Sequence, residues 1–408
     1  MQTLAELDLM NLPMEEAGFS ADPWPHFTAA RGQHPWLAKC AFGYVVHEYE
    51  AMKDLLVQDD KMRLATGMIV QIFGAQGTPW GRMLENGIAC QTGADHRRLR
   101  FTLQPLFSPK QANLNRALMR DVISGLLDAW VPRGAFDFEE FISNFPIGVI
   151  CRMIGAPTAE IPRLRSSLET LGLQFAMDVT MLPALQEATV TLDEFARQVV
   201  ADRRAGRRPV DGEGQLLDVL LEATDAGGMS ERELYDLLIF LFAAGYDTSK
   251  NMMTWIMYDL LDRPEHYRRC AEDLAFCEKI VEESFRFHSV ANIPRLTTAD
   301  VVYRGVLVPE GTMLFFPVSV GGRDPAAFPE PDAYDPERVG VNRHMAFGRG
   351  AHLCLGQYIA RAQIAEGLQL IARRMRNPRL AAPVTWRPFF GVWGLKGLPI
   401  EFEPAPAA

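Results

Sequence analysis

The chain has 408 residues, of which 48% are hydrophobic, and its formal net charge at pH 7 is −10. This hydrophobic content excludes a disordered chain and is enough for a large packed core. The acidic balance argues against a broad basic surface, so we expect no nucleic-acid partner. The six cysteines form no CxxC pair, and apart from Cys354 we expect reduced, mostly buried thiols of a cytoplasmic protein.

The N-terminal segment 1–19 carries four acidic residues and neither lysine nor arginine, so it lacks the basic start of a signal peptide. The longest apolar run, 237–245, is far shorter than the roughly twenty residues that a membrane-spanning helix needs. We therefore expect a soluble, monomeric protein that has no membrane partner.

Apolar residues spaced three and four apart predict that helices dominate the chain. The expected helices lie at 110–131, 137–154, 184–205, 230–262, 272–288 and 357–374. Strand signals are short and lie at 42–47, at about 300–318 and in the tail at about 379–403. These patterns predict a mainly α fold with small β-sheets, an α+β protein, folded as one domain over residues 1–408.

Two long stretches, 61–92 and 321–342, lack clear periodicity, and the second contains four prolines. Long irregular segments inside a compact domain are usually functional or disordered, and the apolar residues of 61–92 argue against disorder. We therefore expect an irregular loop at 61–92 and an ordered, irregular meander at 321–342.

The best-defined helix begins after Ser230, because Ser230 and Glu233 have the spacing of a capping box. It can run to Arg263, since Pro264 stops it. At about 1.5 Å per residue, a helix of this length crosses a whole domain.

The segment FGRGAHLCLG, residues 347–356, is the most specific signal in the chain. Gly348 and Gly350 permit a tight bend, and Gly356 lets the following helix pack closely. The N-terminus of that helix can stabilise a thiolate on Cys354, provided that backbone amides point at the sulfur. A glycine-rich loop that only happens to contain a buried cysteine is the alternative, but the meander before it and the helix after it argue against that alternative.

This segment resembles the haem-binding loop of cytochromes P450, and further motifs match that family in order. They are His96-Arg97-Arg98-Leu99-Arg100, Ala244-Gly245-Tyr246-Asp247-Thr248, Glu283-Ser284-Phe285-Arg286 and Asp335-Pro336-Glu337-Arg338. The matches run from about residue 23 to about residue 400, and the chain is similar to the soluble bacterial branch of the family. The resemblance implies the cytochrome P450 fold and haem b (iron protoporphyrin IX) with Cys354 as the axial iron ligand.

The resemblance also implies a role for residues that taken alone are ambiguous. Glu283 and Arg286 could be an ordinary surface pair, but with Arg338 they are implied to form a buried network. Basic residues of a helix face are usually solvated, yet two haem propionates need cations. The implied cofactor contacts are His96, Arg100, Arg295, His352, Phe347, Gly348, Gly350, Gly356, Ala244 and Gly245.

The central helix carries the residues expected to perform chemistry. Gly245 costs about 1 kcal/mol relative to alanine in a helix interior, which we attribute to the close approach of dioxygen. Thr248 can bond back to the carbonyl of Ala244 and open the helix locally. Asp247 and Thr248 are then an acid–hydroxyl pair that relays protons. The resemblance implies a haem-thiolate monooxygenase that hydroxylates its substrate.

The 408 residues leave no room for a flavin or nicotinamide domain, so we expect electrons from a separate iron–sulfur ferredoxin and its reductase. The expected docking surface is a local basic cluster that suits an acidic partner, made by Arg97, Arg98, Arg349 and Arg361. Two alternatives are a peroxide-dependent enzyme of the same fold and a non-catalytic haem or ligand-binding protein. Asp247 and Thr248 argue against both.

Substrate-pocket candidates come from matching the family's loop over the haem, central helix, turn after the ExxR helix and C-terminal hairpin. They are Met68, Ile69, Ile72, Phe73, Phe240, Ala243, Ala244, Ala291, Ile293, Val392 and Trp393. No lysine or arginine occurs among them, and a buried unpaired carboxylate is costly. We therefore expect a small to medium neutral hydrophobic substrate such as a terpenoid or alkyl-aromatic compound, with long-chain fatty acids and then steroids as alternatives.

Overall fold

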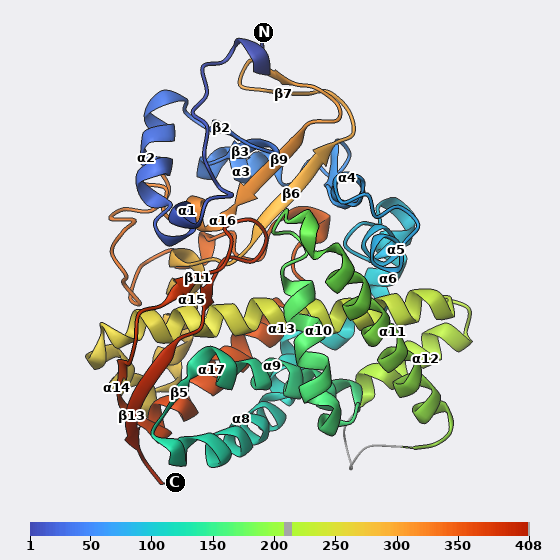
Figure 1. Ribbon diagram of the computed structural model, residues 1–408, viewed down its shortest axis with the longest axis vertical. Helices are drawn as coiled ribbons and strands as arrows, with labels where there is room; N and C mark the ends of the chain where they lie inside the picture. The colour runs from blue at the N-terminus through green and yellow to red at the C-terminus, as the bar shows by residue number, and fades with distance from the viewer. Residues whose placement is uncertain (208–213, 407–408) are drawn as a thin grey trace.

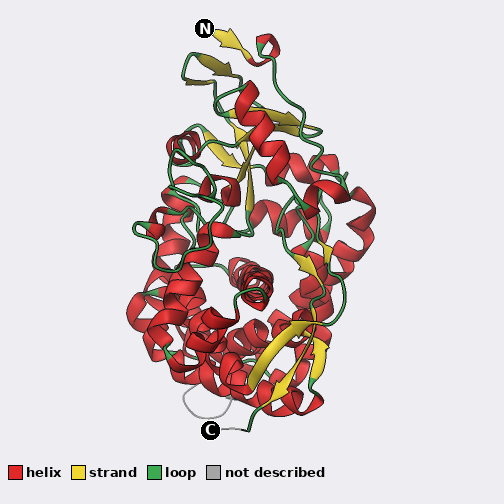
Figure 2. Cartoon of the chain, turned by 90° about the vertical axis from the view of Figure 1, so that its left-hand side faces the viewer, coloured by secondary structure: helices red, strands yellow, loops and turns green. Residues whose placement is uncertain are grey.

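The computed structural model describes residues 1–207 and 214–406. Helices form most of the molecule, and one long helix, α13 (Glu231–Leu261), crosses its middle (Figure 1). Figure 2 views this helix end-on, with other helices around it. The expectation of a mainly α fold with small sheets is confirmed.

The capping box at the start of α13 is present. The Ser230 amide donates to the Glu233 carboxylate at 2.8 Å, and the Glu233 amide donates to the Ser230 hydroxyl at 3.2 Å. The helix ends at Leu261, two residues before the expected end at Arg263, because Pro264 begins the next helix, α14 (Pro264–Glu272). The local sequence therefore fixes both ends of this helix to within two residues.

The other expected helices are present, except that the expected helix 110–131 is two helices that meet at Asn115. The structure also has helices that were not expected, among them Ile161–Gly172 and Gln215–Asp225. The α-helices before α13 are α1 (Ala17–Ala21), α2 (Trp24–Gln33), α3 (Tyr49–Leu55), α4 (Thr66–Ile72), α5 (Pro79–Asn86), α6 (Gly93–Leu103), α7 (Pro109–Leu114), α8 (Arg116–Trp130), α9 (Phe138–Ile154), α10 (Ile161–Gly172), α11 (Leu182–Arg204) and α12 (Gln215–Asp225). After α14 come α15 (Leu274–Phe287), α16 (Val318–Gly322) and α17 (Gln357–Arg374). Short 3-10 turns lie at Leu4–Glu6, Gln104–Phe107, Val131–Arg133, Thr158–Glu160, Val179–Met181, Val341–Arg343 and Gly350–His352.

The largest sheet lies toward the end of the molecule that carries the N-terminus (Figure 1). Its strands run in the order β2 (Leu37–Cys40), β3 (Gly43–Val46), β9 (Met313–Pro317), β6 (Asn292–Thr297) and β4 (Met62–Leu64). All neighbours are antiparallel except β3 and β9. The expected strands at 42–47 and 300–318 are present, whereas β6 was not expected.

Three smaller sheets complete the β structure. One joins β1 (Gln2–Thr3), β8 (Val306–Val308) and β7 (Val301–Tyr303), and another joins β10 (Met375–Leu380), β13 (Pro399–Pro404) and β5 (Ala135–Asp137). The last is a pair, β11 (Thr385–Trp386) and β12 (Leu395–Lys396). Strands in the C-terminal tail were expected.

The expectation that 61–92 is an irregular loop was wrong, because this segment holds β4, α4 and α5. The Thr78 hydroxyl accepts a hydrogen bond from the Gly81 amide, and Pro79 occupies the first turn of α5, which is favourable at a helix start. The buried rings of Phe73 and Trp80 pack with centroids 5.1 Å apart and hold the two short helices together. Helices this short show too few turns for their periodicity to stand out in the sequence.

One hydrophobic cluster extends from Leu4 to Phe402 and includes residues of both the helices and the largest sheet. Within residues 1–207 and 214–406, no helix is both long and apolar enough to cross a membrane.

Candidate active site

The cysteine loop joins the irregular segment after α16 to the start of α17. Gly348 (φ 69°) and Gly350 (φ 76°) have left-handed backbone conformations, which glycine adopts without strain. The Cys354 amide donates to the Phe347 carbonyl at 2.9 Å and closes the loop. The bend that the two glycines predicted is therefore present.

Cys354 is the only one of the six cysteines, all within the described part of the chain, whose side chain is exposed. Surrounding protein still removes much of the water near its sulfur, and this burial raises the pKa of the thiol. The backbone amides of Gly356 and Gln357 bond to the sulfur and, with the nearby Arg100 and Arg361, favour the thiolate. A cation bound to the sulfur would shift the balance further toward the thiolate.

The Glu283, Arg286 and Arg338 side chains form one buried cluster. Arg286 donates from Nε to Glu283 Oε2 at 2.8 Å, and Arg338 Nε lies 3.4 Å from Glu283 Oε1. Arg286 and Glu283 are fully buried. The two guanidinium groups also donate to backbone carbonyls between residues 322 and 333, so the cluster fixes the irregular segment before the cysteine loop.

A second set of contacts, made by residues of α15 and α17, holds the cysteine loop itself. Arg361 donates to the Glu282 carboxylate, and its guanidinium lies 4.4 Å from the Phe347 ring centroid. The Phe347 ring packs edge-on against Phe285 at 4.6 Å. Burial opposes ionisation of Glu282, but His344 and Arg361 together lower its pKa to about 2.

Four basic side chains from three parts of the fold gather beside the cysteine loop. The His96 and His352 rings lie 4.2 Å apart, and Arg100 donates to the Leu353 carbonyl. Arg295, from β6, is buried, and its Nε has no hydrogen-bond partner among the described residues. The four basic residues among the implied cofactor contacts are thus brought together.

This cluster is electrostatically unfavourable as it stands. Burial and then the neighbouring His96 and Arg295 lower the pKa of His352 to about 4. Burial, followed by Arg100, also lowers the pKa of His96, and burial lowers the pKa of Arg295. A site that gathers basic side chains and leaves the buried Nε of Arg295 without a partner fits an anionic group such as the two propionates of a haem, which would favour the charged forms of these side chains.

The central helix presents Ala244 and Thr248 close to one another. The Thr248 hydroxyl donates to the Ala244 carbonyl at 2.8 Å, as expected, but α13 stays helical through this point, so the expected opening is absent. The structure gives Gly245 a further reason: a Cβ there would lie 2.3 Å from Ile150 Cδ1, so the glycine permits close packing of α9. The approach of dioxygen at this glycine stays a prediction.

Asp247 is buried and held by groups that the sequence did not nominate. Its carboxylate forms a two-point ion pair with Arg387, with distances of 2.6 and 3.1 Å, and accepts a hydrogen bond from Asn251 at 3.0 Å. Lys250 Nζ lies 3.7 Å away. Gly172 permits this arrangement, because a Cβ there would lie 2.5 Å from the Asp247 carboxyl carbon.

The candidate pocket residues differ in their exposure. Ile69, Phe73 and Trp393 are buried, and Ile72 is exposed on the surface. The Trp393 indole donates to the Ser20 carbonyl and packs against Trp255, so it supports the core. The more accessible candidates are Met68, Phe240, Ala243, Ala244, Ala291, Ile293 and Val392.

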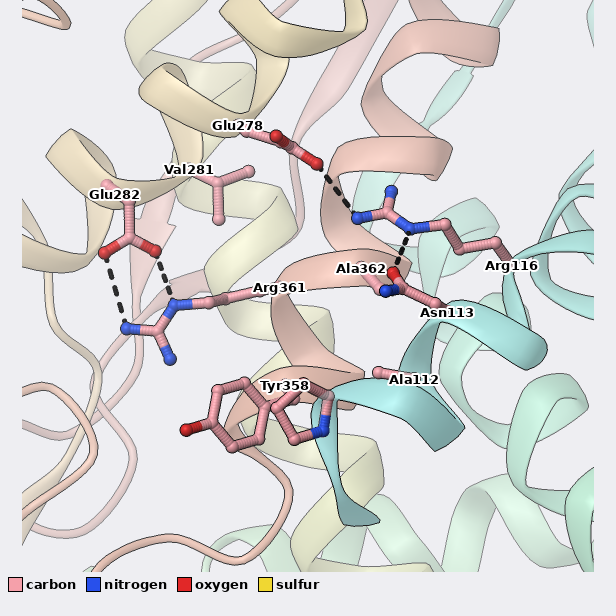
Figure 3. A pocket seen from close by; sticks show the side chains of 10 residues that line it. Ala112, Asn113, Arg116, Glu278, Val281, Glu282, Tyr358, Arg361 and Ala362 are labelled. Atoms are coloured by element: carbon pink, nitrogen blue, oxygen red, sulfur yellow. Dashed lines mark hydrogen bonds and ion pairs between the residues drawn. The ribbon is translucent and has the colours of Figure 1, made fainter. Parts of the chain in front are cut away.

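Of the four arginines expected to dock a partner, two are already paired. Arg98 bonds to Glu233, and Arg361 bonds to Glu282. Arg361 lies beside a cavity of about 300 Å³ where α7, α15 and α17 meet. Figure 3 shows the ion pair of Arg361 with Glu282 and, beside it, the ion pair of Arg116 with Glu278. Arg97 is exposed and Arg349 half-buried, and neither has a carboxylate partner among the described residues.

Comparison with known proteins places these features in a family. A family model described as Cytochrome P450 matches residues 168–376. Luteothin monooxygenase of Streptomyces thioluteus is 29% identical over 406 residues, covering 98% of this chain and 97% of the relative. Pentalenic acid synthase of Streptomyces avermitilis is 32% identical over 314 residues, covering 76% of each protein.

Solved structures share the fold. The crystal structure of CalO2 superposes with a TM-score of 0.85 at 23% identity and covers 97% of this chain and 100% of that chain. Epothilone B-bound cytochrome P450epoK has a TM-score of 0.85 at 21% identity, with 96% and 99% covered.

The fold and the cysteine loop define a haem-thiolate oxidoreductase. The chain belongs to the cytochrome P450 family, and its matches are to bacterial members, as the sequence motifs predicted. It is a cytochrome P450 monooxygenase.

We predict that Glu283→Gln lowers the free energy of unfolding by about 3–5 kcal/mol, because it leaves Arg286 and Arg338 without a carboxylate. Denaturant unfolding measures this loss. Glu278→Gln, on the same helix, is the control, because its half-exposed carboxylate pairs with Arg116 at the surface and contributes about 1 kcal/mol or less. Equal losses in the two variants would contradict the assigned role of Glu283.

Proposed function

We propose that this chain binds haem b and inserts one atom of dioxygen into a small to medium, neutral, hydrophobic substrate. Its electrons come from a separate ferredoxin and reductase. The proposal rests mainly on the grouping of these side chains: Cys354, with two amides on its sulfur, lies near four basic side chains, and Nε of Arg295 is buried without a hydrogen-bond partner among the described residues.

In this proposal Cys354 holds the iron, and the four basic side chains described above hold the propionates. A thiolate-ligated haem supplies cleavage of the O–O bond, to which the thiolate contributes electron density. The amides of Gly356 and Gln357 stabilise the charge on sulfur, and the N-terminus of α17 adds to this effect. The protein thus orients the cofactor and sets its electrostatics.

Proton delivery is assigned to Thr248 and Asp247. Because the Thr248 hydroxyl donates its hydrogen bond to the Ala244 carbonyl, its oxygen is free to accept a hydrogen bond from another group. Asp247 is the neighbouring acid, and Arg387 and Asn251 hold its carboxylate away from bulk water. For Asp247 to pass a proton toward Thr248, it must loosen its ion pair with Arg387, which makes Arg387 a positioning residue.

The electron donor is proposed to dock near the start of α17. The exposed Arg97 and the half-buried Arg349 offer positive charge there on a chain whose net charge is −10. A local positive patch of this kind suits an acidic ferredoxin, and added salt would weaken the association of the two proteins. The continuous core supports one catalytic domain over the whole chain, and six free cysteines support a reducing cytoplasm.

The substrate class rests on the accessible pocket candidates, which are apolar and include no cation for a carboxylate. Burial of apolar surface favours binding by about 25 cal/mol per Å², whereas an unpaired buried carboxylate is heavily penalised. Two relatives are named luteothin monooxygenase and mycinamicin IV hydroxylase/epoxidase. These names support an oxygen-inserting reaction for this chain, whereas the compounds in them belong to the relatives.

Thr248→Ala is expected to keep oxygen consumption but to yield more peroxide and less hydroxylated product, and Asp247→Asn to slow turnover. The ratio of product to oxygen consumed measures the coupling, which a simple loss of folded enzyme leaves unchanged. Thr254→Ala is the matched control, because this buried threonine of α13 makes the same bond to the carbonyl four residues back, at 2.8 Å. Wild-type rate and coupling in both site variants would refute the relay.

We predict that neutral terpenoids and alkyl-aromatic compounds shift the ferric haem from low to high spin and bind more tightly than carboxylic acids of matched size. Titration of the haem absorption with both panels gives the dissociation constants. Consistently tighter binding of the acids would contradict the proposed substrate class and favour fatty acids.

A further inference from the structure

Asp59, in the turn after α3, joins two parts of the candidate haem site. Its Oδ2 accepts a hydrogen bond from the amide of Ala351, in the cysteine loop, at 2.8 Å. Its Oδ1 lies 3.7 Å from Nη1 of Arg295, which β6 supplies. One carboxylate therefore contacts both the loop that carries Cys354 and one of the four basic side chains gathered there.

The loop and the turn after α3 are fitted to each other at Gly350. A Cβ on this residue would lie 2.7 Å from Asp59 Oδ2 and 3.1 Å from the Leu56 carbonyl oxygen. Its φ of 76° also disfavours other residues. The second glycine of the loop is thus required for the contact with Asp59 as well as for the bend.

Haem binding alone does not explain why the Asp59 carboxylate lies at this place. Asp59 attracts the same cations that two propionates require, so it competes with the propionates. Asp59 Oδ1 and Arg295 Nε are both buried, and neither has a hydrogen-bond partner among the described residues. The ion pair therefore leaves Arg295 donors for another anion while the carboxylate stays beside the loop.

We propose that Asp59 is a positioning residue of the haem site: it fixes the cysteine loop through the Ala351 amide and lowers the haem iron's reduction potential through its charge. This inference rests on the proposed function, namely that Cys354 ligates haem iron. Reduction adds one electron from the iron–sulfur donor to the ferric iron and breaks no bond. A nearby negative charge favours the more positive ferric state.

The test compares the reduction potentials of the substrate-free holoenzyme and its variants in a spectroelectrochemical titration at fixed pH and salt. Asp59→Asn keeps an oxygen acceptor for the Ala351 amide and removes the charge, so the potential is expected to rise. Asp60→Asn is the matched control, because Asp60 is adjacent and exposed. Equal potentials in the two variants would overturn the electrostatic role.

The loop contact is tested by haem loss, measured as transfer of haem to excess apomyoglobin. Asp59→Ala is expected to accelerate the transfer roughly tenfold or more, as for other residues that support metal ligands. A rate equal to that of Asp60→Ala would overturn the positioning role. If Asp59→Ala does not fold, the potential of Asp59→Asn decides alone. A wild-type enzyme without a thiolate-type haem spectrum would instead refute the proposed function itself.

Discussion

The Glu283 carboxylate holds Arg286 and Arg338 in a buried cluster on which the geometry of the cysteine loop depends. The segment from 322 to 347 has little regular structure, so its carbonyls find few partners in helices or sheets. The two arginines bond several of these carbonyls and give an irregular chain one conformation. Buried ion pairs add little net stability, so this cluster is best understood as specifying a shape.

Charged side chains elsewhere around the site are also held in place by specific partners. Four basic side chains gather at the cysteine loop, where we propose that the haem propionates bind, and two acids are each held by specific partners. Asp247 is held by Arg387 on the side of α13, and Asp59 is held by the Ala351 amide on the side of the cysteine loop. Each acid is thus fixed at its place in the fold. The site therefore combines attraction for an anionic cofactor with two positioned negative charges.

The parts of the site that the sequence predicted are those coded within a few residues. The bend at Gly348 and Gly350 and the capping box at Ser230 depend on neighbours in the chain, and short motifs record them. Arg387 and Asp59 could not be predicted, because their partners lie 140 and 292 residues away. The packing of Ile150 against Gly245 could not be predicted for the same reason, because Ile150 belongs to another helix.

The central claim is that Cys354 is the thiolate ligand of a haem iron, and the absorption spectrum of the reduced carbon monoxide complex tests it most directly. The account predicts a band at the position typical of thiolate ligation in the wild-type protein. Replacement of Cys354 by histidine should move this band to the position of an imidazole-ligated haem. An unchanged spectrum in Cys354→His would contradict the assignment of the ligand.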